Sequence, residues 1–578
     1  MTRPAHNASQ TSFRSVIRTP PGTSVRVWAA AAVLMATFAA QNIIEMRKQS
    51  ATFDEVAHLP AGYTYLVKHD FRLNPEHPPL LKVLCALPLL ALQPRIDFND
   101  PNWEVLPKEY AFGSSFLYSN NADRLLFWGR LPVVGIAVLL GFFVFRWSQQ
   151  LYGNAAGLVA LTLFAFSPNL IAHSHLVTTD IGVAAFLTMA FYFLWRHSCL
   201  GDNRSLYWGS LAMGAALASK FSAVVLFPVG ALMLWSFHSP HSQTNPTPPV
   251  TSSGTHVKGN TRGKAHKEAK KERMRSSSQG QSWEKIIRGD RRKVAAVVVF
   301  VALALLVVLL SYLRSLDPSL YLKGMEQVNK NHRPDFPFYL HGSLKAGGWW
   351  FYFLVVFVIK ATAPFIILVL GRIILFLRNS RIEWKSEIFL LLPAIVFFVA
   401  TSALADPLGV RYLLPVFPFL MVFSSGVINY LPGKRAASWT LWGLLGWHIA
   451  SSLLAFPNHI SYFNEFVGGA SHGTDWLDDS NVDWGQELKE LKNDLNGQNI
   501  ENVTLLSFSP YDNPSYYGIQ CIRPPQEAWS AIFSNPQPGY YAVSAHWVAR
   551  AKGLGFDWKS KYPLTANIGN SMFVFKVP

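Results

Sequence analysis

Apolar residues along the chain are gathered into long runs, and short polar stretches separate these runs. A helix of about 20 apolar residues is long enough to cross a hydrocarbon core of about 30 Å. The pattern therefore predicts a polytopic α-helical membrane protein with about eleven transmembrane helices. The predicted spans are 25–43, 127–146, 155–172, 181–196, 206–219, 221–237, 294–312, 349–377, 387–404, 412–430 and 438–456.

Composition supports the membrane interpretation. Half of the 578 residues are hydrophobic and only 15% are charged, whereas a soluble chain usually carries about a quarter charged residues. The three cysteines, Cys85, Cys199 and Cys521, are widely spaced and indicate neither a disulfide framework nor a zinc site. No metal and no cofactor are expected.

Positive charge is concentrated in the segment 238–293, which holds 13 Lys and Arg against four Asp and Glu. Its composition predicts a disordered loop, and a basic loop between two spans indicates the cytoplasmic side. A nucleic-acid-binding arm is the alternative, but a nucleic-acid partner is not expected. The stretch 206–237 is interpreted as two short helices that meet near Lys220, because a single crossing would place the basic loop outside. Residues 1–24 then form a cytoplasmic tail.

Two regions outside the predicted spans are large enough for chemistry, and both fall on the outer face. Residues 44–124 follow the first span, and residues 457–578 end the chain. The second region is predicted to be a small extracytoplasmic α/β domain, because strand-like and helical stretches alternate with Pro, Gly and Asn. The strand-like stretches are VTLLSFS, YYAVSAHWV and MFVFKV, and the helical one is GQELKELKNDL.

Charged and polar side chains are dense in the first outer region. Asp54, Glu55 and His58 lie within five positions, and His77 and Lys82 follow some twenty residues later. A carboxylate can take the proton of an attacking hydroxyl, and basic side chains can neutralise a departing phosphate without a metal. By themselves, paired acids in a loop are more often a solvated surface pair, so these residues alone leave that alternative open.

Two motifs in this region resemble the first-loop signature of the protein O-mannosyltransferases, glycosyltransferase family 39. They are D-E-x-x-H-x-x-x-G-x-x-Y, which begins at Asp54, and H-P-P-L-x-K, which begins at His77. The chain departs from these enzymes at Pro75, where they usually carry an Asp. Further similar segments are Gly129-Arg130-Leu131-Pro132, SHLVTTD ending at Asp180, and GVRYLLPVFPF with Arg411.

The resemblance implies a GT-C-like catalytic module over residues 25–456 in the plasma (inner) membrane of a bacterial-type enzyme. Such an enzyme would transfer mannose or a similar hexose, with inversion, from a polyprenyl-phosphate carrier to a hydroxyl of a protein, lipid or surface glycan. Asp54 is expected to be the catalytic base, and Glu55 its support. The residues expected to bind the donor phosphate are His77, Lys82, Arg130, Lys220 and Arg411, and those expected to contact substrate are His58 and Asp180.

For Arg130 the resemblance leaves two partners open, Glu55 or the donor phosphate. The run DWLDDSNVDWGQEL after the last span is either a helix-capping segment or part of the acceptor side. Two other functions remain as alternatives: a transporter of lipid-linked sugars and a non-catalytic membrane scaffold. Transporters tend to place charges at the midplane and to contain internal repeats, whereas here the charges cluster at one predicted interface and no repeat is evident.

Overall fold

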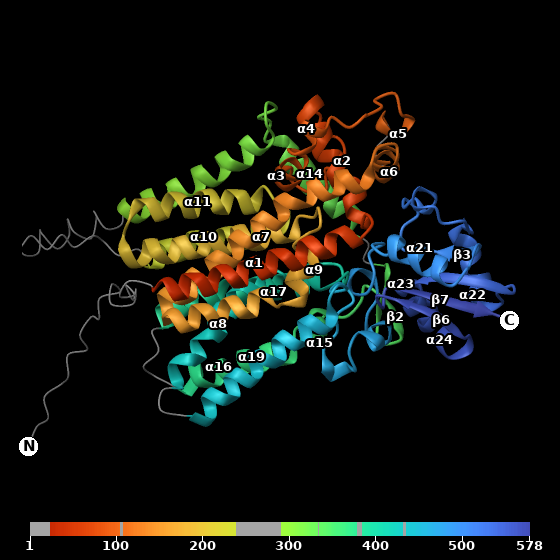
Figure 1. The fold of residues 1–578 in the computed structure, drawn as a ribbon. Helices are drawn as coiled ribbons and strands as arrows, with labels where there is room; N and C mark the ends of the chain where they lie inside the picture. The colour runs from red at the N-terminus through yellow and green to blue at the C-terminus, as the bar shows by residue number, and fades with distance from the viewer. Residues whose placement is uncertain (1–23, 105–107, 238–290, 333–334, 379–383, 432–434) are drawn as a thin grey trace, which may run out of the picture.

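The computed structural model describes residues 24–104, 108–237, 291–332, 335–378, 384–431 and 435–578. The predicted cytoplasmic tail and the predicted basic loop lie outside the described residues, except for Ser24 and residues 291–293. In Figure 1 the long helices run side by side, and the C-terminal domain lies at one end of this bundle.

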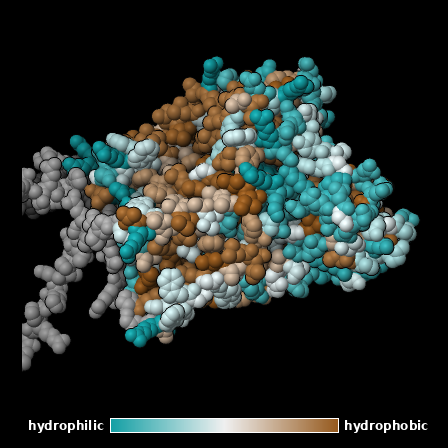
Figure 2. Space-filling view, in the orientation of Figure 1, coloured by the Kyte–Doolittle hydropathy of each residue, from teal (hydrophilic) through white to brown (hydrophobic). Residues whose placement is uncertain are grey.

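Within the described part of the chain, five helices are long and apolar enough to cross a membrane, and a bent pair of helices provides a sixth candidate. Each coincides with a predicted apolar run. Apolar side chains cover the bundle, whereas hydrophilic side chains cover most of the C-terminal domain (Figure 2). The five helices are α1 (Val25–Lys48), α7 (Ala122–Tyr152), α10 (Asp180–Leu200), the helix Arg291–Ser311 and α17 (Trp384–Leu404).

The other predicted runs also form helices, but shorter or interrupted ones, so the count of about eleven spans stays a prediction. The stretch 206–237 divides as expected, because α11 ends at Leu217 and helical structure resumes at Phe221. Lys220 lies between them in extended backbone. The shorter helices are α8 (Asn154–Ala165), α9 (Pro168–His173), α11 (Asn203–Leu217), η2 (Phe221–Leu226), α12 (Phe227–Phe237), η3 (Val410–Leu413), α18 (Val416–Ser425) and η4 (Gly426–Tyr430), whereas α19 (Arg435–Ala455) has 21 residues.

The predicted span 349–377 is wrong as a single straight helix. It forms α15 (Tyr352–Lys360) and α16 (Ala363–Arg378), which are bent by 113° at the break between them. A helix end leaves backbone carbonyls without intrahelical partners, and here Asn464 takes them: its side-chain amide donates to Val358 (2.6 Å) and Ala361 (2.8 Å). The apolar pattern contains no sign of this break because the partner comes from a distant part of the chain.

The first outer region folds into short helices at the same end of the bundle as the C-terminal domain (Figure 1). Its main helix begins at Phe53, where Thr52 and Glu55 form a capping box. The amphipathic helix α14 (Ser319–Asn331) and the hairpin of β1 (Pro337–Leu340) and β2 (Ser343–Ala346) follow the helix Arg291–Ser311. The helices of the first outer region are α2 (Phe53–Lys68), α3 (Leu80–Ala86), α4 (Leu89–Leu92), α5 (Pro101–Glu104) and α6 (Glu109–Tyr118).

The C-terminal domain is built on a five-stranded sheet in the order β4-β3-β5-β7-β6, which agrees with the predicted α/β domain. β3 runs parallel to β4 and β5, whereas β7 is antiparallel to β5 and β6. The predicted strand YYAVSAHWV is wrong beyond Ser544, because helix α23 begins at Ala545. The strands are β3 (Val503–Leu506), β4 (Cys521–Ile522), β5 (Gly539–Ser544), β6 (Leu564–Ile568) and β7 (Met572–Val577).

Helices surround this sheet and connect it to the bundle. The segment that leads into it docks directly on the start of α2: the Ser50 amide donates to Gln486 and the Phe53 amide to Trp484, both at 2.9 Å. The α-helices are α20 (Gly473–Trp476), α21 (Leu488–Gly497), α22 (Trp529–Ser534), α23 (Ala545–Gly553) and α24 (Trp558–Lys561). The 3-10 helices are η5 (Glu465–Val467), η6 (Ala470–His472), η7 (Asp479–Asn481), η8 (Pro514–Tyr517) and η9 (Gln526–Ala528).

Replacing Asn464 with Ala tests the origin of the bend between α15 and α16. The substitution leaves two backbone carbonyls, that of the buried Ala361 among them, without this donor, and we expect the free energy of unfolding to fall by about 2 kcal/mol. Thermal unfolding of the detergent-purified protein measures the effect, with Asn496→Ala, on the exposed face of α21, as the control. Equal stability of the two variants would contradict the capping role.

Candidate active site

Asp54 and Glu55 are neighbours in the first turn of α2, but their carboxylates have different partners. The Glu55 side chain is fully buried and accepts two hydrogen bonds from Arg130, at 2.8 and 2.7 Å. The backbone amide of Val177 also donates to it, at 2.9 Å. Burial by itself would raise the pKa of Glu55, but the Arg130 guanidinium and the backbone donors outweigh it and lower the pKa. Glu55 is therefore a fixed carboxylate.

Arg130 has no donor left for a phosphate in this arrangement. Its remaining N–H groups donate to the carbonyls of Met46 (2.7 Å), Gln49 (3.3 Å) and Ser50 (2.7 Å). Together with the two bonds to Glu55, these occupy all five N–H groups of a guanidinium. Of the two partners left open by the sequence, the structure pairs Arg130 with Glu55, so its predicted direct contact with the donor phosphate does not fit this geometry.

Asp54 is paired with Arg411, which lies in η3, 357 residues later in the chain. An Arg411 Nη1 donates to Asp54 Oδ2 at 2.5 Å. The guanidinium also lies over the ring of Trp484, 4.3 Å from its centre. The Arg411 Nε is buried and has no hydrogen-bond partner among the described residues. At least this donor of Arg411 is therefore unused within the described part of the chain.

Lys220 and Asp180 form a second ion pair beside the first. The Lys220 ammonium donates to Asp180 Oδ1 at 2.5 Å and lies 4.4 Å from the centre of the Tyr412 ring. Arg411 also lies over this ring, at 5.3 Å. Two cations predicted as site residues, each paired with a predicted carboxylate, thus share Tyr412 as an aromatic neighbour, and the sequence did not single out this tyrosine.

His58 and His77 complete this group, with ring centres 5.3 Å apart. Burial lowers the pKa of His58 to about 4, although the nearby Asp54 opposes the shift. Burial and the neighbouring His58, Lys220, Lys82 and Arg411 lower the pKa of His77 well below its ordinary value of 6.5. Both imidazoles are consequently neutral near pH 7 and act as hydrogen-bonding groups, so the predicted binding of phosphate by a protonated His77 requires the phosphate itself to raise that pKa.

Lys82 lies near this group, but hydrogen bonds to other residues occupy its ammonium. Its ammonium donates to the Tyr65 hydroxyl (2.9 Å), to the Asn74 carbonyl (2.6 Å) and to the Asn74 side-chain oxygen (3.1 Å). An ammonium has three N–H groups, and all three are used. Burial lowers the pKa of Lys82 to about 7. The predicted phosphate contact of Lys82 therefore does not fit the structure, and its observed contacts fix the loop before His77.

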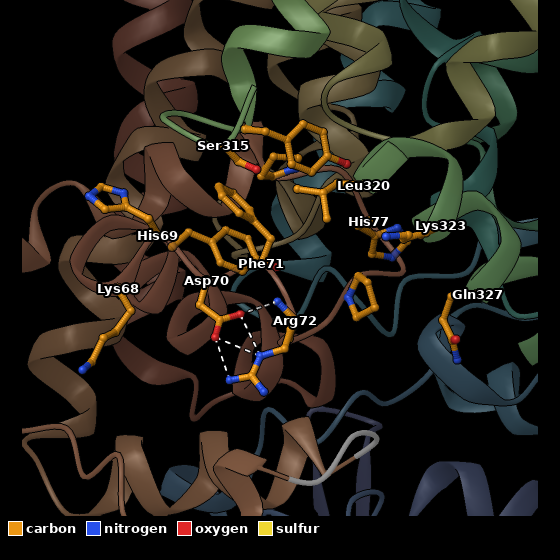
Figure 3. A pocket seen from close by; sticks show the side chains of 14 residues that line it. Lys68, His69, Asp70, Phe71, Arg72, His77, Ser315, Leu320, Lys323 and Gln327 are labelled. Atoms are coloured by element: carbon orange, nitrogen blue, oxygen red, sulfur yellow. Dashed lines mark hydrogen bonds and ion pairs between the residues drawn. The ribbon is translucent and has the colours of Figure 1, made fainter. Parts of the chain in front are cut away.

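A pocket of about 600 Å³ opens next to His77, between the end of α2 and α14. His77 and Lys323 lie on one side of it, and the ion pair of Asp70 and Arg72 lies on another (Figure 3). The pocket combines an apolar wall with a basic rim. Its lining residues are Tyr65, Lys68, His69, Asp70, Phe71, Arg72, Pro75, His77, Pro79, Tyr312, Ser315, Leu320, Lys323 and Gln327.

The segment 478–487 fixes the loop that carries Arg411. The Asn481 side-chain oxygen accepts from the Val410 amide at 3.0 Å, and the Ser480 hydroxyl donates to the Leu408 carbonyl at 2.8 Å. Asp478 is used elsewhere, because Arg550 Nε donates to it at 2.9 Å. Among the described residues, no group of three His, Cys, Asp or Glu side chains could hold a metal ion. This segment therefore supports the site by holding the loop of Arg411. Its Asp-rich sequence did not predict that role.

The comparisons with known proteins support the resemblance seen in the sequence. The family model described as dolichyl-phosphate-mannose-protein mannosyltransferase matches residues 123–251, which include Arg130, Asp180 and Lys220. The resemblance to this family is thus confirmed over that part of the chain. No curated protein matches the chain at a significant level.

Solved structures with similar architecture were also found. ArnT from Cupriavidus metallidurans bound to undecaprenyl phosphate is 12% identical, with a TM-score of 0.47 over 96% of this chain and 98% of that chain. Its apo form is 11% identical, with the same TM-score and coverage. The archaeal oligosaccharyltransferase AglB from Archaeoglobus fulgidus, in complex with an inhibitory peptide and a dolichol-phosphate, is 13% identical, with a TM-score of 0.39 over 74% of this chain and 54% of that chain.

Replacing Glu55 with Gln tests the fixed pair at the start of α2. The change leaves the buried Arg130 guanidinium without a compensating charge, so we expect unfolding to become easier by about 3–5 kcal/mol. The measurement is thermal unfolding of the purified protein. Glu326→Gln serves as the control, because it removes an exposed ion pair with Lys330 and should leave stability unchanged. Wild-type stability of the Glu55 variant would show that the pair is not structural.

The buried acids of the segment 478–487 predict a pH dependence of stability. Burial raises the pKa of Asp483 to about 7, and burial together with the Asp483 charge raises the pKa of Glu487 to about 8. The folded protein then retains protons that the unfolded chain has lost, so stability declines as the pH rises from about 4, the ordinary carboxyl pKa, up to the folded values of about 7 and 8, and levels off above them. We expect a lower melting temperature at pH 8.5 than at pH 6. In the Asp483→Asn variant this difference should shrink, and an unchanged difference would contradict the assignment.

Proposed function

We propose that the protein transfers a sugar, mannose or a similar hexose, from a polyprenyl-phosphate carrier to an acceptor hydroxyl at the outer face of the plasma membrane. The observation that carries the proposal is the pairing of Asp54 with Arg411, with Lys220 and His77 beside them. This group combines a carboxylate for the acceptor with cations for a departing phosphate. Such an arrangement suits glycosyl transfer without a metal.

Asp54 is the base in this proposal. Its carboxylate accepts the proton of the acceptor hydroxyl while the hydroxyl oxygen bonds to the anomeric carbon of the sugar. The bond between that carbon and the phosphate oxygen breaks, and the polyprenyl phosphate leaves with the bonding electrons. Attack from the face opposite to the phosphate inverts the anomeric centre. Glu55 is excluded as the base because it is fully buried and holds Arg130, so it positions α2 instead.

The leaving phosphate is stabilised by Arg411, Lys220 and His77. The buried Nε of Arg411 offers a donor that no described residue uses, and charge-assisted bonds of this kind are stronger than neutral ones. The pocket beside His77 extends the site with the basic side chains of Lys68 and Lys323, and its apolar wall suits the first isoprene units of the carrier. Arg130 supports the site by holding Glu55, and Lys82 supports it by holding the loop at Asn74.

The orientation in the membrane follows from charge. Basic residues such as Arg146, Arg196 and Arg378 lie near the ends of α7, α10 and α16, and an excess of such residues marks the cytoplasmic side. Asp180, at the other end of α10, belongs to the site. The site, the pocket and the C-terminal domain would therefore face outward, where a carrier-linked sugar meets protein, lipid or glycan acceptors.

Replacing Asp54 with Asn tests the enzymatic function. A nearly isosteric amide cannot accept the proton, so we expect transfer to fall by about a hundredfold or more, while binding of free undecaprenyl phosphate to the purified protein is retained. The product is measured by mass spectrometry of glycoproteins, glycolipids and surface glycans from cells that lack the gene and carry either variant or wild type. Glu326→Gln is the control.

Full product in cells with Asp54→Asn would rule out this carboxylate as the base and favour the transporter or scaffold alternatives. A different outcome is that Asp54→Asn loses both product and binding of undecaprenyl phosphate. In that case the Asp54 side chain holds the donor and is not the base.

A further inference from the structure

We propose that Tyr110 is a further substrate contact, whose hydroxyl donates a hydrogen bond to the acceptor beside Asp54. The inference rests on the proposed function and names a residue that neither of the two motifs of the first outer region contains. It is carried by the packing of α6 on α2, by the ring contacts of Tyr110 and by its hydroxyl, which is protonated and has no hydrogen-bond partner among the described residues.

The packing of α6 on α2 places Tyr110 beside the start of α2. Gly113 lies so close to α2 that a Cβ added there would be 1.8 Å from the Val56 carbonyl oxygen. That oxygen is accessible because Pro60, one helical turn later, has no N–H to bond it. Residues three apart share a helix face, so Tyr110, three before Gly113, faces Phe53, three before Val56. Phe53 directly precedes Asp54.

The Tyr110 ring lies in a cluster of three aromatic side chains. It lies 4.3 Å from the Phe53 ring at an angle of 27°, and 5.4 Å from the Tyr511 ring at 22°. The Phe53 and Tyr511 rings are themselves 6.3 Å apart, so the three rings contact one another. Tyr511 belongs to the loop that follows β3 in the C-terminal domain. The half-buried Tyr110 side chain is thus held between the first outer region and the C-terminal domain.

The hydroxyl of this fixed ring has no hydrogen-bond partner among the described residues, whereas the buried Tyr65 hydroxyl has several. The carboxylates of Asp54, Glu76 and Glu109 raise the pKa of this hydroxyl, whereas Arg411 lowers it. Burial and these carboxylates raise the pKa of Tyr110 well above its ordinary value, so the hydroxyl keeps its proton and is available as a donor.

The contact is assigned to the acceptor because of the side on which Tyr110 lies. Of the groups proposed for the phosphate, Lys220 and His77 lie on the side of α10 and the pocket, and Arg411 lies over the ring of Trp484. Tyr110 lies on the side where the C-terminal domain meets α2, through Tyr511 and Phe508. An acceptor that reaches Asp54 from outside the membrane would enter on this second side, and the Tyr110 hydroxyl would orient it for deprotonation.

The test is Tyr110→Phe, with Tyr511→Phe as the matched control. Tyr110→Phe keeps the ring contacts and removes only the unpartnered hydroxyl. Tyr511→Phe removes a hydroxyl from another ring of the same cluster. Membrane and wall material from cells that lack the gene is the acceptor source, and its dilution series gives an apparent acceptor KM. We expect Tyr110→Phe to raise this KM about tenfold, with unchanged melting temperature and unchanged affinity for undecaprenyl phosphate, and the control to be unaffected.

The inference would be overturned by a wild-type acceptor KM in Tyr110→Phe, or by an equal rise of the acceptor KM in the two tyrosine variants. Loss of undecaprenyl phosphate affinity in Tyr110→Phe would also overturn it, because the contact would then be to the donor. Failure of the proposed function is distinguishable, since it requires product in cells that carry Asp54→Asn, whatever Tyr110→Phe does.

Discussion

The buried ion pair of Glu55 and Arg130 is the constraint on which the site depends. Removing two opposite charges from water is expensive, and the cost is offset only when both are fully hydrogen-bonded. Here the guanidinium binds three carbonyls between the end of α1 and the start of α2, and the carboxylate binds α2 and the backbone at Val177. One pair thus fixes the first span, the second span and the first outer region relative to one another. Asp54, which directly precedes Glu55 in α2, is positioned by that arrangement.

Distant segments then complete the site around Asp54. Asn464 holds the bend between α15 and α16, and the carbonyls of Ile460 and Asn481 bind the Lys360 ammonium at 2.8 and 2.7 Å. Lys360 ends the apolar helix α15, and these bonds use two of the three N–H groups of its ammonium. The same segment supports the loop of Arg411. The C-terminal domain is therefore part of the active-site scaffold, and its removal would leave both the bend and the Arg411 loop without their partners.

Hydrogen bonding divides four cations predicted to bind the donor phosphate into two groups. Arg130 and Lys82 have every donor occupied, so they set the geometry of the backbone. Arg411 and Lys220 each hold a carboxylate and lie at the edge of the site, where an incoming phosphate can compete for them. The neutral state of His58 and His77 limits positive charge in the empty site, because several cations held close together would repel one another. A phosphate dianion would remove that repulsion.

The sequence by itself determined the membrane class, the apolar helices, the two outer regions and the residues of the DE and HPPL motifs. It could do so because hydrophobic periodicity and length are local properties, and motif residues stand close together in the chain. The sequence did not determine that 349–377 is bent, that Lys82 and Arg130 are fully bonded, or that Trp484, Tyr412 and Tyr110 surround the site. Only the tertiary structure decided these features, because each depends on hydrogen bonds or ring contacts between residues brought together from separate elements.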